Sequence, residues 1–148
     1  MRIRTWSALV ILAVAAAALG GCARAALDTT GFAAVNSTTV NAPFDEAWQA
    51  TKAILREKDY EIYTRDKRGT FVAFTQMKRR FFVAPVRTKH TIYLEGESDD
   101  STCVTVETVR QVYGVTMLTY PGWHDRKTTD NAEAVELLDA LQAKFPKA

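Results

Sequence analysis

A chain of 148 residues with 19 basic and 17 acidic side chains is long enough for one folded domain and is close to neutral. This balance argues against the strongly basic surface that nucleic-acid-binding proteins carry. Two histidines and two cysteines, none of them paired at ligand spacing, argue equally against a zinc site and a disulfide framework.

The N-terminal segment has the features of a removable export signal. Arg2 and Arg4 supply a positive start, and the 12 residues from 8 to 19 are apolar and uncharged. A membrane-spanning helix needs about 20 such residues. A positive start, a short apolar run and small residues at the cleavage point are typical of a secretory signal.

The residues that end this segment are Leu19-Gly20-Gly21-Cys22, which resembles the lipobox of bacterial lipoproteins. The resemblance implies cleavage between Gly21 and Cys22 and attachment of lipid, including palmitate, to Cys22. Two or three acyl chains make a stable membrane anchor, whereas one chain is marginal. The alternative is an ordinary secretory signal cleaved after Ala23-Arg24-Ala25, with Cys22 an incidental thiol.

Cleavage would define the mature chain. Residues 1–21 are the expected signal peptide, 22–33 a lipid-anchored tether and 34–148 a single domain. Loss of two of the 19 basic residues leaves 17, equal to the 17 acidic ones. The expected location is the bacterial cell envelope; Ala23, in place of the Asp that retains enteric lipoproteins in the inner membrane, favours the outer membrane facing the periplasm. Cys103 is then left as a structural thiol or, alternatively, a reactive or intermolecular one.

The domain is predicted to begin with a strand and a helix. Residues 34–40 are rich in β-branched side chains. Pro43 followed by two acidic residues marks a helix start, and the helix is expected to run to about Lys58. One apolar stripe recurs at helical spacing and predicts the buried face, with Trp48 as a core anchor. The stripe comprises Phe44, Ala47, Trp48, Thr51, Ile54 and Leu55.

The middle of the chain is typical of antiparallel strands. Residues 60–65 and 70–76, joined by the polar turn 66–69 that ends in Gly69, predict a hairpin. Residues 77–85 leave two alternatives, a continuing strand or a basic, aromatic loop. Residues 86–97 and 102–112 predict two further strands.

The C-terminal part is predicted less completely. Residues 113–120 are compatible with a short strand or an irregular segment, and residues 120–127, with Pro121 and Gly122, predict a loop. A helix is expected from about Asp130 to the stop at Pro146, with Val135, Leu138, Leu141 and Phe145 on its buried face.

These elements predict an α+β fold, an antiparallel sheet of about five to six strands with two helices on one face. The segment Ala42-Pro43-Phe44-Asp45-Glu46-Ala47-Trp48 is similar to the start of START-like helix-grip domains. The segments 59–62 and 66–69 resemble a pattern in helix-grip domains of envelope lipoproteins such as the outer-membrane assembly factor BamC. The resemblance covers residues 35–148 and implies a helix-grip-like fold.

No catalytic constellation is visible in the sequence. There is no nucleophile beside a positioned base, no phosphate-binding loop and no dinucleotide glycine run, so no enzyme activity, cofactor or metal is expected.

Two surface patches are candidates for partner binding. Arg79 and Arg80 lie in a basic run beside Phe81-Phe82, and the alternative is a solvated hairpin end above two core phenylalanines. Tyr120 and Trp123 lie in the predicted Pro-Gly loop, and the alternative is Trp123 folded over the sheet edge.

The sequence therefore predicts a membrane-anchored, non-enzymatic envelope lipoprotein that acts as an interaction or assembly module for another envelope protein. The alternative is a carrier of a small hydrophobic ligand or lipid in a helix-grip cavity, which needs roughly 300 Å³ or more.

Overall fold

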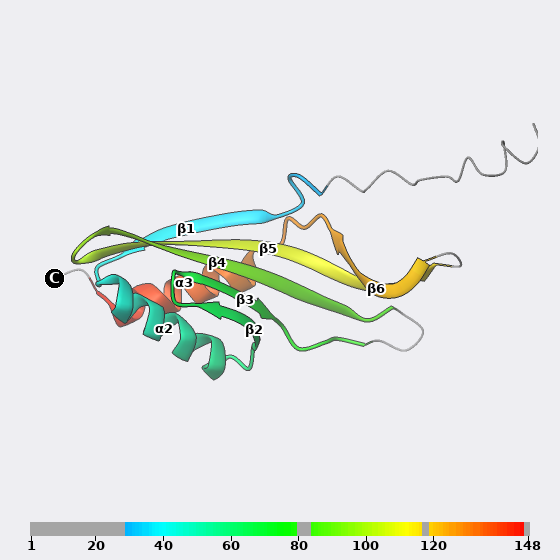
Figure 1. The fold of residues 1–148 in the computed structure, drawn as a ribbon, viewed down its shortest axis with the longest axis horizontal. Helices are drawn as coiled ribbons and strands as arrows, with labels where there is room; N and C mark the ends of the chain where they lie inside the picture. The colour runs from blue at the N-terminus through cyan, green and yellow to red at the C-terminus, as the bar shows by residue number, and fades with distance from the viewer. Residues whose placement is uncertain (1–28, 80–83, 117–118, 147–148) are drawn as a thin grey trace, which may run out of the picture.

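The computed structural model describes residues 29–79, 84–116 and 119–146. Apart from the segment 119–126, the strands and helices follow one another in the predicted order. Gly21, Cys22 and Arg80 lie outside these residues. The described residues form one six-stranded sheet and two helices (Figure 1). In order, the elements are β1 (Ala34–Val40), α2 (Phe44–Glu57), β2 (Glu61–Asp66), β3 (Thr70–Phe74), β4 (Val86–Ser98), β5 (Ser101–Thr116), β6 (Thr119–Arg126) and α3 (Ala132–Lys144).

The sheet is open and antiparallel, with the strand order β1-β5-β4-β3-β2 and with β6 also paired to β5. β1 pairs with residues 102–108 of β5, and β6 pairs with residues 110–116. The two strands therefore lie end to end along the same side of β5. With two helices beside this sheet, the predicted α+β fold class is confirmed.

The core lies between the sheet and the two helices. Trp48 of α2 is only 8% exposed, and its ring lies 5.1 Å from that of Phe71. Its Nε1–H donates to the Asp66 carbonyl oxygen at 3.0 Å. The predicted role of Trp48 as a core anchor is confirmed, and so is the burial of the helix stripe at Ala47, Thr51, Ile54 and Leu55.

Strand alternation separates the two faces of the sheet. Ile92 and Leu94 of β4 and Val104 and Val106 of β5 are buried on the face that the helices cover. The odd-numbered residues of β4 and β5 point to the opposite face, which neither α2 nor α3 covers. We call this the helix-free face.

The prediction of a loop at residues 120–127 is wrong, because Thr119–Arg126 forms β6. Proline and glycine usually end strands, but β6 has β5 as its only strand partner among the described residues. An edge strand tolerates Pro121 because one side of its backbone needs no ladder hydrogen bonds. Gly122 lies opposite Gly114, beside a register shift between Gly114 and Thr116.

The buried face of α3 also differs in part from the prediction. Val135 is 38% exposed, whereas Leu137 is fully buried. The buried positions are Ala134, Leu137, Leu138 and Leu141, which follow a helical spacing of their own. Docking against β1, β5 and α2 therefore selects a stripe slightly rotated from the one that the apolar residues suggested.

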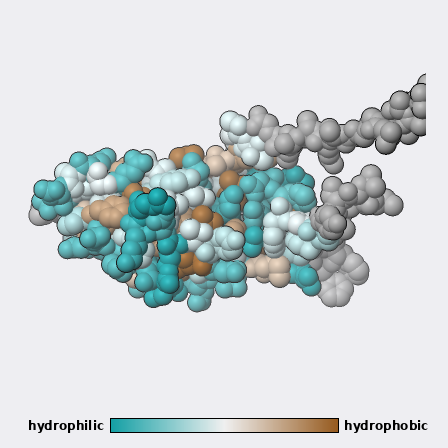
Figure 2. All heavy atoms as spheres, in the orientation of Figure 1, coloured by the Kyte–Doolittle hydropathy of each residue, from teal (hydrophilic) through white to brown (hydrophobic). Residues whose placement is uncertain are grey.

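The surface has no continuous hydrophobic area on the side shown in Figure 2, where hydrophobic residues form small, separate areas among hydrophilic ones. Within the described ranges, no helix is both long and apolar enough to cross a bilayer.

Candidate functional site

An arginine lies between two aromatic rings on the helix-free face. The Arg87 guanidinium carbon of β4 is 3.8 Å from the ring centroid of Phe74 in β3 and 4.1 Å from that of Trp123 in β6. Both distances are within the range of cation–π attraction, which holds the planar guanidinium in place.

The stacking continues in both directions across the sheet. The ring centroids of Tyr113 and Trp123 are 5.4 Å apart, and those of Tyr63 and Phe74 are 6.1 Å apart, both edge to face. Five side chains from five strands thus form one continuous row, which we call the aromatic–arginine row. Its members are Tyr63, Phe74, Arg87, Tyr113 and Trp123.

A network of polar side chains on β5 and β6 holds Arg87 by hydrogen bonds. Gln111 lies opposite Arg87 on one side and opposite Asp125 on the other. Arg87 Nε donates to Gln111 Oε1 at 2.8 Å, and Gln111 Nε2 donates to Asp125 Oδ1 at 2.7 Å. Lys89 Nζ donates to Asp125 Oδ2 at 3.3 Å. The network orders both the arginine and the carboxylate beside it.

Arg87 has hydrogen-bond donors that the described residues do not use. Burial lowers the pKa of its guanidinium, and the carboxylates of Glu61 and Asp125 partly oppose that shift. Only its Nε is hydrogen-bonded to described residues, so its two terminal nitrogens can donate to an incoming acceptor.

The predicted partner-binding residues lie in different parts of the fold. Trp123 is half-buried in the aromatic–arginine row, which places it on the sheet and not in a loop. Tyr120 lies in β6, and nothing is described of its side chain. Arg79 is exposed in the β3–β4 connection, next to the isolated bridge between Lys78 and Val86. Among the described residues, nothing connects Arg79 with the row.

Sequence reasoning missed Arg87, Gln111 and Asp125. In the sequence, Arg87 and Gln111 are each one polar residue in a strand of alternating polarity, which is the ordinary pattern of a half-buried sheet, and Asp125 lies in the segment predicted to be a loop. One weak signal was present: Arg87 and Lys89 are both cationic and share a face of β4.

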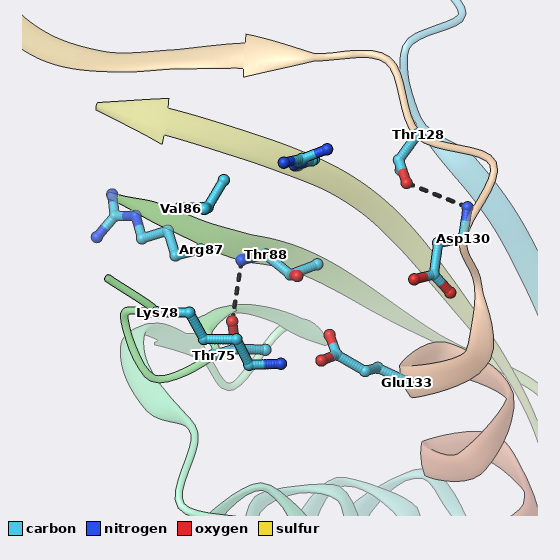
Figure 3. A pocket seen from close by; sticks show the side chains of 9 residues that line it. Thr75, Lys78, Val86, Arg87, Thr88, Thr128, Asp130 and Glu133 are labelled. Carbon is cyan, nitrogen blue, oxygen red and sulfur yellow. Dashed lines mark hydrogen bonds between the residues drawn. The ribbon is translucent and has the colours of Figure 1, made fainter. Parts of the chain in front are cut away.

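The end of the sheet that the helices leave open carries a polar pocket. Its volume is about 500 Å³, and it lies between β4, β5, the β3–β4 connection and the start of α3 (Figure 3). Lys78 and Glu133 point into it from opposite sides, whereas the Arg87 side chain points away from Glu133. Among the described residues, Val86 is the only apolar one in the lining, which comprises Thr75, Lys78, Val86, Arg87, Thr88, Arg110, Thr128, Asp130 and Glu133.

A buried histidine holds the Glu133 carboxylate. His90 of β4 is fully buried; its Nε2 lies 3.2 Å from Glu133 Oε2, and its Nδ1 lies 3.0 Å from Thr108 Oγ1. Burial lowers the pKa of His90, and the hydrogen bond and charge of Glu133 oppose that shift. Tyr60 packs edge-on to the histidine at 5.4 Å, and burial, with Glu133 and Glu136, raises its pKa to about 12.

Thr108, His90 and Glu133 follow the order hydroxyl, imidazole, carboxylate that nucleophilic catalysis uses. However, Thr108 is 2% exposed and His90 0% exposed, so a substrate cannot reach the hydroxyl. We therefore interpret the trio as a structural link between β4, β5 and α3. No group of three metal-ligand side chains occurs in the described part of the chain.

Comparison with known proteins adds no family. No protein-family model matches the chain, and no curated protein matches it. Function must therefore be inferred from the chemistry of the site and not from the fold.

Proposed function

We propose that this protein is a lipoprotein anchored in the bacterial envelope, with its domain facing the periplasm from the outer membrane. The domain acts as a non-enzymatic interaction or assembly module for another envelope protein. The lipobox-like Leu19-Gly20-Gly21-Cys22 supports the anchor. The small size of the domain and its even balance of charges support an adaptor role.

The observation that carries the proposal is the aromatic–arginine row. Trp, Tyr and Arg are the residues most enriched among those that dominate binding energy at protein interfaces. Here they lie together on the helix-free face, where they contribute to no helix–sheet packing. Because Arg87 is already ordered by two rings and Gln111, little side-chain entropy is lost on binding.

The geometry also defines the partner's chemistry. The free terminal nitrogens of Arg87 suit a carboxylate, and the faces of Trp123 and Tyr113 suit an apolar or aromatic side chain beside it. A segment of the partner with one acidic and one apolar side chain would satisfy both.

The alternative, a carrier of a hydrophobic ligand or lipid, is less well supported. Apolar side chains dominate the lining of sites for such ligands, whereas eight of the nine described residues that line the 500 Å³ pocket are polar or charged. Between the helices and the sheet, large side chains such as Trp48, Phe71 and Leu137 form one packed cluster.

Crosslinking in intact membranes tests the proposed function. A tagged protein and its Trp123→Ala variant are each crosslinked and purified. The envelope proteins that co-purify with each are then identified and their amounts compared. We expect Trp123→Ala to lose the partner by a factor of about 10 or more, because an interface anchor contributes upwards of about 2 kcal/mol. Its thermal midpoint should fall by several degrees, since Trp123 loses its contacts with Arg87 and Tyr113, each of which contributes about 1 kcal/mol to folding.

Tyr93→Ala is the matched control. Tyr93 is an aromatic residue of β4 on the same face, 37% exposed and outside the row. Its loss should leave partner recovery unchanged. Equal recovery from Trp123→Ala and the parent protein would rule out the row as the binding site.

A further inference from the structure

The sheet has three edge strands, and two of them are protected against further pairing. β2 carries Glu61, Arg65 and Asp66 and has a register shift between Ile62 and Thr64. β6 contains Pro121 and ends in a charged pair. Charges, proline and bulges are the features by which natural proteins prevent unwanted pairing at sheet edges.

β1 has none of these features. Its seven residues, Ala-Val-Asn-Ser-Thr-Thr-Val, contain no charge and no proline, and its register with β5 is uninterrupted. Among the described residues β5 is its only strand partner, so the opposite row of backbone donors and acceptors faces outward.

Two side chains of β1 are in unfavourable surroundings in a single copy: one is an exposed apolar side chain and the other a buried acceptor without a donor. Val35 is 59% exposed, although it lies in a regular strand. On the other face, Asn36 Oδ1 is buried and has no hydrogen-bond partner among the described residues. A buried acceptor without a donor is costly, and it marks a place where a donor is missing.

We propose that β1 pairs with β1 of a second copy of this chain, antiparallel, so that two sheets become one. An uncharged strand can pair with itself without opposing like charges. The register that pairs all seven residues has its two-fold axis at Ser37. In this register each residue meets one on the same face, because Ser37 lies opposite itself and Val35 lies opposite Thr39.

The same register supplies what β1 lacks. Val35 is covered by Thr39 of the second copy. Asn36 comes opposite Thr38 of the second copy, whose hydroxyl oxygen accepts from Gln142. Asn36 Oδ1 is covered in the single copy, so its side chain must turn toward the edge to accept from that hydroxyl. In this register the exposed valine and the unpaired acceptor each gain a partner.

A seven-residue edge is small compared with a stable interface of about 1,600 Å². The pairing therefore depends on a high local concentration, and here it rests on the proposed function, because the proposed lipid anchor would confine the chain to a membrane surface. For this reason the test uses the full lipidated chain in its own membrane.

Disulfide trapping tests the register. Cα atoms directly opposite in antiparallel strands lie about 4.5–5.5 Å apart, which a disulfide can span. In a Cys103→Ser background, Ser37→Cys should give, under mild oxidation of membranes, a band of twice the chain mass on a non-reducing gel. Co-expressed Val35→Cys and Thr39→Cys chains should give the same band, and an added Ser37→Lys should reduce it several-fold.

Arg65→Cys is the control, because Arg65 is exposed on β2, the opposite edge strand, and lies outside the aromatic–arginine row. A dimer band from Arg65→Cys as strong as that from Ser37→Cys would mean random collision and would overturn the proposal. The proposal would also be overturned if every β1 variant stayed monomeric. A crosslinked band of another mass would overturn it too, because it would show that the β1 edge pairs with a different protein. Loss of Trp123 leaves this crosslink unchanged, so failure of the dimer and failure of the proposed partner site are distinguishable.

Discussion

His90 is a titratable side chain with no access to water, and its surroundings determine how the fold responds to acid. Three groups face it: the Thr108 hydroxyl, the Glu133 carboxylate and the Tyr60 ring. Burial disfavours the charged imidazolium, and its pKa in the folded protein is therefore lowered from the ordinary value of about 6.5. Below that pH the unfolded chain binds a proton that the folded chain resists.

Acidification from pH 7 to 5 should therefore lower the free energy of unfolding, since the unfolded state takes up more protons over this range. Ordinary carboxylates have pKa values near 4 and stay ionised there. His90→Gln, which keeps a donor and an acceptor but does not titrate, should flatten the dependence. Urea unfolding of the two proteins at a series of pH values measures the slopes; an equal slope would mean that His90 does not cause it.

Arg87 shows which part of the site could not be predicted from the sequence. Its contacts are Phe74, Gln111 and Trp123, and Trp123 is 36 positions away along the chain. They meet only because β3, β4, β5 and β6 adopt one particular register. Trp123 could be selected by residue type alone, but the sequence did not indicate that its neighbour is an arginine.

At the scale of elements, the turn of the β2–β3 hairpin contacts β4 through its last residue, Gly69. Gly69 has φ +110°, and its carbonyl oxygen accepts from the Leu94 N–H at 2.8 Å. A Cβ at this position would lie 2.3 Å from the Leu94 carbonyl oxygen and 3.1 Å from Phe44. Only glycine permits both the backbone conformation and the approach.

Gly69→Ala should therefore destabilise the protein by about 3 kcal/mol, from left-handed strain and a backbone clash together. Gly31→Ala is the matched control, because Gly31 has φ +74° but nothing lies within 4 Å of its Cβ position. It should cost only about 1 kcal/mol. Chemical denaturation of both variants measures the difference, and equal losses would show that the contact with Leu94 is unimportant.

The elements that were predicted well are those whose signals are local. The stripe of α2, the turn at 66–69 and the alternation of β4 and β5 each depend on residues a few positions apart. β6 was missed because Pro121 and Gly122 are strong local signals for a loop, and an edge position beside β5 overrides them. The buried face of α3 differs from the predicted one because packing against the sheet, and not apolar spacing alone, determines which side of the helix is buried.

At the scale of the whole molecule, the proposed attachment to the membrane would determine where the row and the β1 edge can act. If Cys22 carries the lipid, Cys22→Ser should move most of the protein from the membrane fraction to the soluble fraction. The physical reason is that each buried CH₂ of an acyl chain contributes about 0.8 kcal/mol to membrane binding.

Fractionation of cells that express the two forms gives the measurement, and mass spectrometry of the N-terminus identifies the lipid. Cys103→Ser is the control, because Cys103 lies within β5 and should not affect attachment. Equal membrane recovery of the Cys22→Ser form would contradict the lipoprotein assignment.

The position of β5 has a consequence for the order in which the chain can fold. β1 is the first of the described strands to be synthesised, yet its partner residues are 102–108, and β6 fills the remainder of the same edge of β5. A nascent chain that stops before Ser101 therefore has a β1 with nothing to pair with and a β4 with one bare side. Pairing across such a separation is slow compared with local contacts. Cooperative folding of this protein must therefore wait until nearly all of its residues are available, which on the proposed route of export means after they have crossed the inner membrane.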